Sequence, residues 1–205
     1  MRTLPALLLI LPSIVAWSSS SDSSRRAFFQ SSAAALFVGA APANAVGSPI
    51  RYGDESIMVQ KEHGTSANPV QSDLLYGVDN QLADRICNYN RHFAEIGGYF
   101  QKTTFEDAVL NAQGPITFYD SVTGKPLFVA PKNRSAEEFV KESRKHGWPS
   151  FRDDEVVWEN VRVLRNSGET VSLDGTHLGH NLPDSKGNRY CINLVSIAGK
   201  PTGSV

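Results

Sequence analysis

Cysteine is scarce in this chain of 205 residues, which has two thiols, Cys87 and Cys191. Two cysteines cannot form a disulfide framework, so a small fold held together by disulfides is excluded. The chain has no CxxC pair, which excludes the common metal sites built from such pairs. Basic residues form neither a run nor a stripe, and nothing therefore indicates a nucleic-acid partner.

Long apolar runs are confined to the first 45 residues. Residues 1–17 carry the run LPALLLILPSIVAW, which is short for a membrane span and is typical of a secretory signal. After a serine-rich spacer, Arg25 and Arg26 precede two phenylalanines, a second apolar run and the sequence ANA at 43–45. This order resembles a twin-arginine export signal. Residues 1–45 are therefore predicted to be a bipartite targeting leader.

Two such signals in series resemble the route into the thylakoid lumen of an alga whose plastid lies inside the secretory system. The alternative is one signal anchor with a chance arginine pair. Three of the 20 basic residues and one of the 21 acidic residues precede Val46, which leaves 17 against 20 and a net charge of −3. The remaining chain of about 160 residues suffices for one domain with its own core. We expect it to be monomeric and, once the leader is cleaved, to make no membrane contact.

The first half of this remaining chain lacks strand patterns. Residues 46–70 are rich in glycine, serine, proline and charge without periodicity, and are expected to form an extended arm. Residues 71–115 are predicted to be a helical extension. Its first helix starts at Ser72, with Asp79 as a plausible start of a second part. The apolar residues that recur every four positions there are Leu74, Val78, Leu82 and Ile86.

Strand patterns begin at Ile116. Residues 116–119 and 126–130 predict a hairpin, and the capping box Ser135–Glu138 predicts a helix that ends by Gly147. Three more strands are expected at 155–164, 169–173 and 190–197, before a loose tail at 199–205. The fold class is therefore mainly β (α+β), with an antiparallel β domain at 116–198 behind the helical extension.

The segment 175–198 combines groups suited to sulfur chemistry. On a strand, Cys191 and Asn193 project from one face. His177 and His180 would lie on opposite faces of a straight strand, but Gly179 allows a turn or bulge that aims both imidazoles at one site. A thiol, two imidazoles and a carboxamide at this spacing indicate nucleophilic catalysis.

Four short motifs follow one another in this half of the chain. They are GKPLF at 124–128, GWPSF at 147–151, HLGH at 177–180 and RYCIN at 189–193. In this order they resemble the B-type methionine sulfoxide reductases, which reduce the R epimer of methionine sulfoxide in proteins. The resemblance runs from about Tyr119 to Ala198 and implies a fold of two antiparallel sheets.

The resemblance implies a role for each group of the segment. Cys191 is the nucleophile that attacks the sulfoxide sulfur as a thiolate and becomes a sulfenic acid. His177 and His180 protonate and orient the sulfoxide oxygen, and Asn193 orders the site. Without the resemblance, a lone strand cysteine is more often a small buried hydrophobe.

Three further residues are expected on the substrate side. Trp148 is the apolar wall for the methionine methyl group that GWPSF implies, and Phe151 is assigned beside it, although core packing suits Phe151 as well. Arg189 shares its face with Cys191 if the strand has begun there, and either raises the local positive potential or is a surface charge.

Recycling of the sulfenic acid departs from the family pattern. Many members have the recycling cysteine two positions before the tryptophan of GWPSF, where this chain has His146. Cys87 is either a resolving partner or packs on a helix face. Otherwise an external thiol reductant, such as thioredoxin or a lumenal equivalent, reduces Cys191 directly. His63 and His92 stand alone and are expected on the surface.

The structural zinc site of many family members is not expected either. Its four cysteine positions correspond here to Asp120, Thr123, Val171 and Asp174. These side chains cannot supply four thiolates, so neither zinc nor another cofactor is expected, and packing and hydrogen bonds must join the two hairpins.

The leading interpretation is a lumenal reductase that repairs methionine-R-sulfoxide in oxidised proteins. The alternative is a catalytically inactive binding or assembly protein of the same fold in the thylakoid lumen. Three departures from the family pattern favour that alternative. They are the missing recycling cysteine, the missing zinc ligands and a short loop between His180 and Arg189. A metal enzyme built on His177 and His180 is a third reading.

Overall fold

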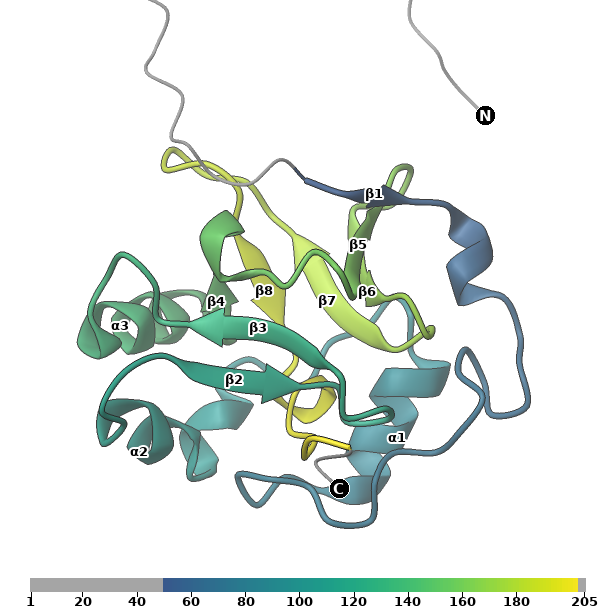
Figure 1. The fold of residues 1–205 in the computed structure, drawn as a ribbon, viewed down its shortest axis with the longest axis horizontal. Helices are drawn as coiled ribbons and strands as arrows, with labels where there is room; N and C mark the ends of the chain where they lie inside the picture. The colour runs from purple at the N-terminus through teal and green to yellow at the C-terminus, as the bar shows by residue number, and fades with distance from the viewer. Residues whose placement is uncertain (1–49, 203–205) are drawn as a thin grey trace, which may run out of the picture. The chain divides into compact units, whose positions relative to one another are not determined.

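The computed structural model describes residues 50–202 (Figure 1). The expected leader at 1–45, the first residues of the expected arm and residues 203–205 lie outside the described part. Within 50–202, no helix has both the length and the apolar character to cross a bilayer.

Two sheets form the body of the molecule, and nearly all their strand pairs are antiparallel. The larger sheet has the order β1-β5-β6-β7-β8-β4, in which only the β1–β5 pair is parallel. The smaller sheet is the hairpin β2-β3. This arrangement confirms the predicted mainly-β fold. In chain order the strands are β1 Tyr52–Gly53, β2 Ile116–Tyr119, β3 Pro126–Ala130, β4 Ser150–Phe151, β5 Val161–Leu164, β6 Glu169–Ser172, β7 His177–Asn181 and β8 Tyr190–Ile192.

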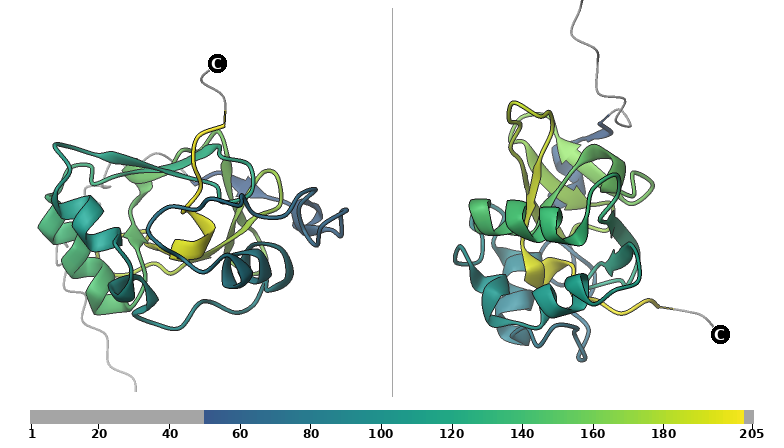
Figure 2. Two further views of the ribbon diagram at one scale, coloured as in Figure 1. Left: turned by 90° about the horizontal axis from the view of Figure 1, so that it is seen from below. Right: turned by 90° about the vertical axis from the view of Figure 1, so that its left-hand side faces the viewer.

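Within residues 50–202, three α-helices surround the sheets, and α2 and α3 lie side by side at one end of the hairpin (Figures 1 and 2). The helices are α1 Asn80–Tyr89, α2 Phe105–Leu110 and α3 Ala136–His146. Four short 3-10 helices complete the set: η1 Glu55–Met58, η2 Tyr99–Lys102, η3 Asp153–Glu155 and η4 Leu194–Ser196. The predicted capping box of α3 is confirmed, since Ser135 and Glu138 each bond the other's backbone N–H.

The first helix begins later than the apolar spacing predicted. Asp79 caps α1 by accepting a hydrogen bond from the Leu82 amide at 2.7 Å, so the helix starts at Asn80 and not at Ser72. The preceding residues bond the chain's C-terminal part instead, as when the Leu75 amide donates to the Ala198 carbonyl. Tertiary contacts thus replace the first predicted turns.

The core lies on one face of the larger sheet, against the β2-β3 hairpin. Phe151 stacks on Phe128 with ring centroids 4.3 Å apart and meets Phe118 edge-on at 5.3 Å. Tyr190 and Ile192 are fully buried in the same cluster. Each such side chain contributes about 2–3 kcal/mol through burial, so this face stabilises the fold.

Two predicted strands are shorter than expected. The segment 155–164 is a strand only over β5, after the turn of η3. The segment 190–197 ends as a strand at Ile192, and η4 follows. The reason is the buried carboxylate of Glu95, which accepts the amides of Leu194 and Val195 at 3.0 and 3.3 Å, so a side chain satisfies these N–H groups.

The expected arm and tail both pack on the domain. Residues 50–70 contain β1 and η1, and the Thr65 hydroxyl donates to the Gly175 carbonyl at 2.6 Å. A Cβ at Gly175 would lie 1.8 Å from the Thr65 carbonyl oxygen, and its φ of +98° also favours glycine. In the tail, the Gly199 amide bonds the Tyr119 carbonyl at 3.0 Å. Residues 50–70 and the start of the tail are therefore attached to the domain by these hydrogen bonds.

Candidate functional site

A row of polar side chains crosses the face of the larger sheet opposite the core. The register pairs Ser150 with Cys191, Cys191 with His180, and His180 with Glu169. Residues directly opposite one another on antiparallel strands project from the same face, so these four side chains form one line across β4, β8, β7 and β6.

The same register corrects the expectation for Phe151. Phe151 pairs with Tyr190, one position away from the Ser150–Cys191 pair, and therefore projects to the opposite face. There it is fully buried in the aromatic core. It packs beneath the site and is not a substrate-binding residue.

A bulge in β7 brings the two histidines to one face. Thr170 pairs with Gly179 and Val171 with His177, so Leu178 is the extra residue. The rings of His177 and His180 lie 5.9 Å apart between centroids, at 80° to each other. A Cβ on Gly179 would lie 2.0 Å from the Cys191 carbonyl oxygen, so the close approach of β7 and β8 requires glycine. The predicted bulge is confirmed.

Cys191 is nearly enclosed, with 9 % of its surface exposed. The Arg189 guanidinium donates a hydrogen bond to its Sγ, and the Ser150 Oγ lies 3.9 Å from the same atom. Arg189 is also buried and forms an ion pair with Asp184, N to O 3.3 Å. Arg189 therefore lies on the same face as Cys191, which was one of the two alternatives for this residue, the other being a surface charge. A cationic donor at the sulfur stabilises the thiolate, which is the nucleophilic form.

Asn193 lies outside the row, because β8 ends before it. Its Oδ1 accepts the Glu95 amide at 2.9 Å, and its Nδ2 donates to the carbonyl of the bulged Leu178 at 3.0 Å. The carboxamide joins the bulge to the loop that follows α1.

That loop, residues 90–98, covers the site from the N-terminal extension. The half-buried Trp148 donates from Nε1 to the Glu95 carbonyl at 3.1 Å, and its ring lies against Gly97. Phe93 and Ile96 are exposed on the loop, at 69 % and 84 %. Sequence reasoning missed Glu95 and this loop, and the pair Gly97-Gly98 was the available signal for a close approach.

Glu169, which sequence reasoning also missed, is fully buried at the end of the row. Its carboxylate oxygens lie 3.8 Å from His177 Nε2, 3.5 Å from His92 Nδ1 and 3.6 Å from an Arg91 nitrogen. Burial raises the pKa of Glu169. His92 is exposed as expected, but it faces this carboxylate. The acid at the start of the predicted strand 169–173, eight residues before His177, was the available signal.

The two site histidines are shifted toward their neutral forms. Burial, with a smaller effect of His180, lowers the pKa of His177 to about 3. Burial and the charge of His92 lower the pKa of His180. A neutral imidazole can accept a proton or relay one from another acid, so acid catalysis by these rings would need a proton donor nearby.

Cys87 does not share this environment. It is fully buried on α1, with Sγ 3.6 Å from the Ser196 hydroxyl and 3.9 Å from the Val195 carbonyl oxygen. Burial raises its pKa, which suppresses the thiolate. The packing alternative agrees with this geometry, whereas nothing in it supports a resolving role.

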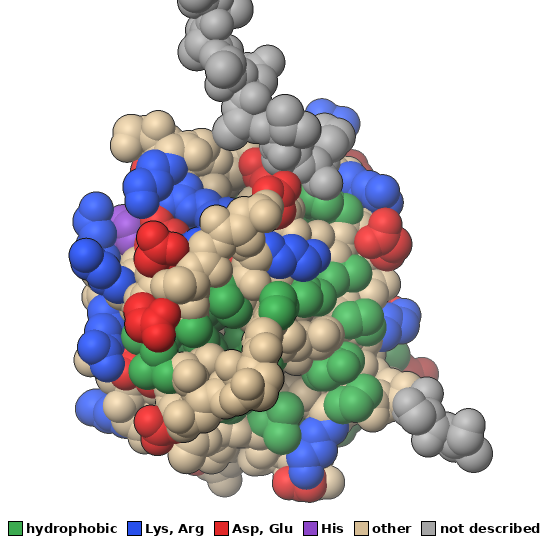
Figure 3. Space-filling view, turned by 60° about the vertical axis from the view of Figure 1, so that its left-hand side comes forward, with side chains coloured by type: hydrophobic (Ala, Val, Ile, Leu, Met, Phe, Trp, Pro, Cys, Tyr) green, Lys and Arg blue, Asp and Glu red, His purple; other side chains and the backbone are tan. Residues whose placement is uncertain are grey.

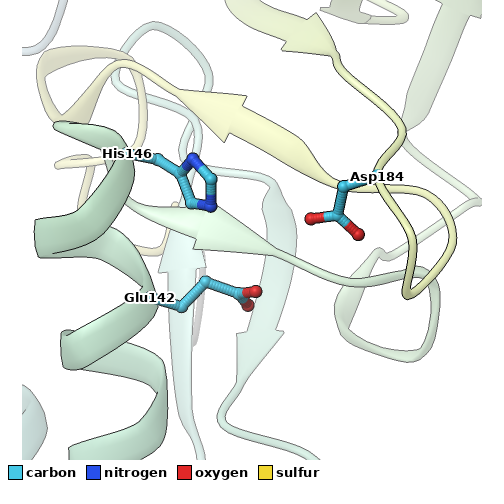
Figure 4. Close-up of side chains that lie close together, drawn as sticks. All are labelled: Glu142, His146 and Asp184. Atoms are coloured by element: carbon cyan, nitrogen blue, oxygen red, sulfur yellow. The ribbon is translucent and has the colours of Figure 1, made fainter.

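His146, at the family's recycling position, lies at the end of α3. Figure 4 shows it with Glu142 of the same helix, facing Asp184 from the β7–β8 loop. Ligand atoms of these three residues lie within 4.8 Å of one another, the spacing of a metal site. Arg152 forms ion pairs with both Glu142 and Asp184, and this guanidinium opposes a second cation at the same carboxylates.

Three of the four residues expected at zinc-cysteine positions have other partners in the structure. The buried Asp120 carboxylate accepts the Val122 amide at 2.8 Å and the Thr176 hydroxyl at 2.9 Å, and Val171 packs against Leu164 in an apolar cluster. Asp174 forms an ion pair with Lys125 at 2.9 Å. The Asp120–Thr176 bond and this ion pair join the two hairpins. His63, expected to stand alone, pairs with Asp84 at 2.9 Å.

Figure 3 shows exposed hydrophobic side chains across one face, with basic and acidic side chains mixed around them. An open hollow of about 400 Å³ beside α1 is lined by Val70, Asp84 and Tyr89 among others, none of which belongs to the row.

Comparison with known proteins gives one partial likeness. No protein-family model matches the chain. A curated relative, the mitochondrial methionine-R-sulfoxide reductase B2 of Danio rerio, is 34 % identical over 71 aligned residues. The alignment covers 27 % of this chain and 39 % of that protein, so the chain spans about two fifths of the relative's length. Part of this chain is therefore similar to a methionine-R-sulfoxide reductase, which supports a reductase activity.

Proposed function

We propose that this protein reduces methionine-R-sulfoxide in polypeptides to methionine. The observation that carries the proposal is the position of Cys191, whose sulfur accepts a hydrogen bond from Arg189 and whose strand neighbours place Ser150 and His180 on the same face. We assign Trp148, two residues before Ser150 and hydrogen-bonded to the loop 90–98, as the apolar wall beside this row. Such a site suits a substrate with a methyl group on one side and a polar S–O bond on the other.

The reaction is a two-electron transfer from one thiol. The Cys191 thiolate bonds to the sulfoxide sulfur while the sulfoxide oxygen takes a proton. The bond from the substrate sulfur to oxygen then breaks, the thioether leaves, and the oxygen ends on Cys191 as a sulfenic acid. In sum, one thiol and one sulfoxide give one sulfenic acid and one thioether.

An external thiol reductant completes the cycle in this proposal. Two thiols of a thioredoxin-like protein or a lumenal equivalent reduce the sulfenic acid to Cys191, form a disulfide between themselves and release water. The burial of Cys87 supports an external donor, since that thiol does not face the row. The targeting leader supports the thylakoid lumen as the location, with oxidised lumenal proteins as substrates.

A single-turnover assay with each epimer of a peptide methionine sulfoxide tests the proposal. Without reductant, about one methionine per chain should form from the R epimer, because one thiol supplies two electrons. Cys191→Ser should abolish this product, whereas Cys87→Ser is the matched control and should retain it. The oxidised protein should gain the mass of one oxygen. A loss of two hydrogens would instead indicate a Cys87–Cys191 disulfide and contradict external recycling.

A binding or assembly protein of the same fold is the second candidate. The observation that favours it is His146, which stands where many B-type reductases have the recycling cysteine. This side chain lies near Glu142 and Asp184 and cannot form a disulfide with Cys191. If the wild-type chain forms no methionine from either epimer, the reductase proposal fails and this candidate replaces it.

A further inference from the structure

Glu169 is a buried acid whose negative charge is not compensated by hydrogen bonds. Both carboxylate oxygens lack a hydrogen-bond partner among the residues that the structure describes, and the side chain is fully buried. An ionised carboxylate in this position carries a desolvation cost of several kcal/mol. The group therefore keeps a proton, shares one with a neighbour, or depends on the Arg91 guanidinium 3.6 Å away to balance its charge.

The neighbour best placed to share it is His177. Its Nε2 lies 3.8 Å from the Glu169 carboxylate, and neither ring nitrogen has a hydrogen-bond partner within residues 50–202. His180 stands directly opposite Glu169 in the β6–β7 register and next to Cys191 in the β7–β8 register. Glu169 thus lies at the far end of a line of ionisable groups that leads to the nucleophile.

The other charged groups around Glu169 come from two further segments. Arg91 and His92 of the loop 90–98 approach it with positive charge, and Glu55 of η1 forms an ion pair with Arg91 at 3.0 Å. His92 is 74 % exposed at its side chain, so it connects the buried carboxylate with solvent. The cluster therefore has an inner end at His180 and an outer end at His92.

We infer that Glu169 is a positioning residue that stores the proton which His177 and His180 deliver to the sulfoxide oxygen. The inference rests on the proposed reductase function. Because burial drives both imidazoles toward neutrality, each keeps one N–H but lacks the second proton of an imidazolium, and the buried carboxyl beside His177 replaces the N–H proton that is given up.

The proton balance is simple. As the Cys191 sulfur bonds to the sulfoxide sulfur, an imidazole N–H gives its proton to the oxygen, and the carboxyl proton of Glu169 replaces it through His177. Glu169 is then a carboxylate opposite Arg91 and His92, and it regains its proton from water on the His92 side. The relay moves one proton and no electrons, and the sulfur chemistry stays at Cys191.

The first test is the pH dependence of the single-turnover rate in Glu169→Gln, which keeps the shape of the side chain but cannot donate an acidic proton. Wild type should lose rate as rising pH removes the stored proton. The variant should be slower by about a hundredfold, and this pH step should be absent. Glu169→Asp should restore the step in part. Glu159→Gln, with a side chain 70 % exposed, is the matched control and should behave as wild type.

A Glu169→Gln variant with the wild-type pH step overturns the inference, even if it is slower. The second test needs no turnover. The ring nitrogens of His177 and His180, observed by NMR, should shift with pH in wild type as Glu169 titrates, and this shift should be absent in Glu169→Gln. An unchanged titration overturns the proton store. If Glu169→Gln loses the shift while the wild-type chain forms no methionine, the reductase proposal is refuted and the coupling of Glu169 to the histidines stands.

Discussion

The two cysteines are both buried, yet different polar groups surround their sulfur atoms. Cys191 lies on a sheet face with a guanidinium at its sulfur and a histidine opposite in the neighbouring strand. Cys87 lies on α1 under η4, where a hydroxyl and a carbonyl oxygen are its polar neighbours and where nearby acids add to the effect of burial on its pKa. Burial alone therefore does not decide how readily a thiol ionises. A positive charge beside the sulfur favours the thiolate, whereas an apolar surrounding disfavours it.

The largest expected effect is a difference in alkylation between these thiols. With iodoacetamide at neutral pH, native protein should be modified at Cys191 at least about a thousandfold faster than at Cys87, which should react only after the domain opens. Mass spectrometry of digested protein at successive times measures both rates. In denaturant the two rates should converge, and a fast Cys87 in native protein would refute the contrast.

The next effect concerns Glu95. Its side chain accepts the Leu194 amide of η4, and its backbone forms hydrogen bonds with the side chains of Asn193 and Trp148. Burial raises the pKa of Glu95 to about 7, above its ordinary value of 4.5. The folded protein thus binds the proton more tightly than the unfolded chain. Unfolding free energy should be highest below about pH 4.5 and fall by about 3 kcal/mol as the pH rises to about 7.

Glu95→Gln should remove this fall, because the amide does not ionise. Urea unfolding at several pH values between about 4.5 and about 7 measures the free energy. Glu159→Gln again serves as the control and should keep the wild-type slope. Equal slopes in Glu95→Gln and wild type would show that another group controls the pH dependence.

The smallest effect removes the guanidinium from Cys191. Arg189→Met keeps an apolar stem but no donor, and a charge-assisted hydrogen bond contributes about 1.5–3 kcal/mol. Alkylation of Cys191 at neutral pH should slow by about ten- to a hundredfold, which brings it closer to Cys87. Arg165→Met, a change at an exposed arginine over the Tyr52 ring, is the control. An unchanged rate would mean that Arg189 does not activate the sulfur.

Local patterns predicted much of the fold and part of the site. The β2-β3 hairpin, the capping box of α3 and the bulge beside Gly179 were correct because each depends on a few neighbouring residues. The end of β8 was missed because a carboxylate about 100 residues earlier, on Glu95, takes the backbone donors of η4. Phe151 was misassigned because its face depends on pairing with Tyr190.

The amino-acid order by itself determined that a thiol, two histidines and a tryptophan stand at spacings suited to sulfur chemistry, and that the chain forms short antiparallel strands. The tertiary structure alone decided that Glu169 and the loop 90–98 join them, that Asn193 ties the loop to the bulge, and that Cys87 packs apart. The physical reason is that desolvation and charge act between residues that are close in space, and strand register brings together residues distant in the chain.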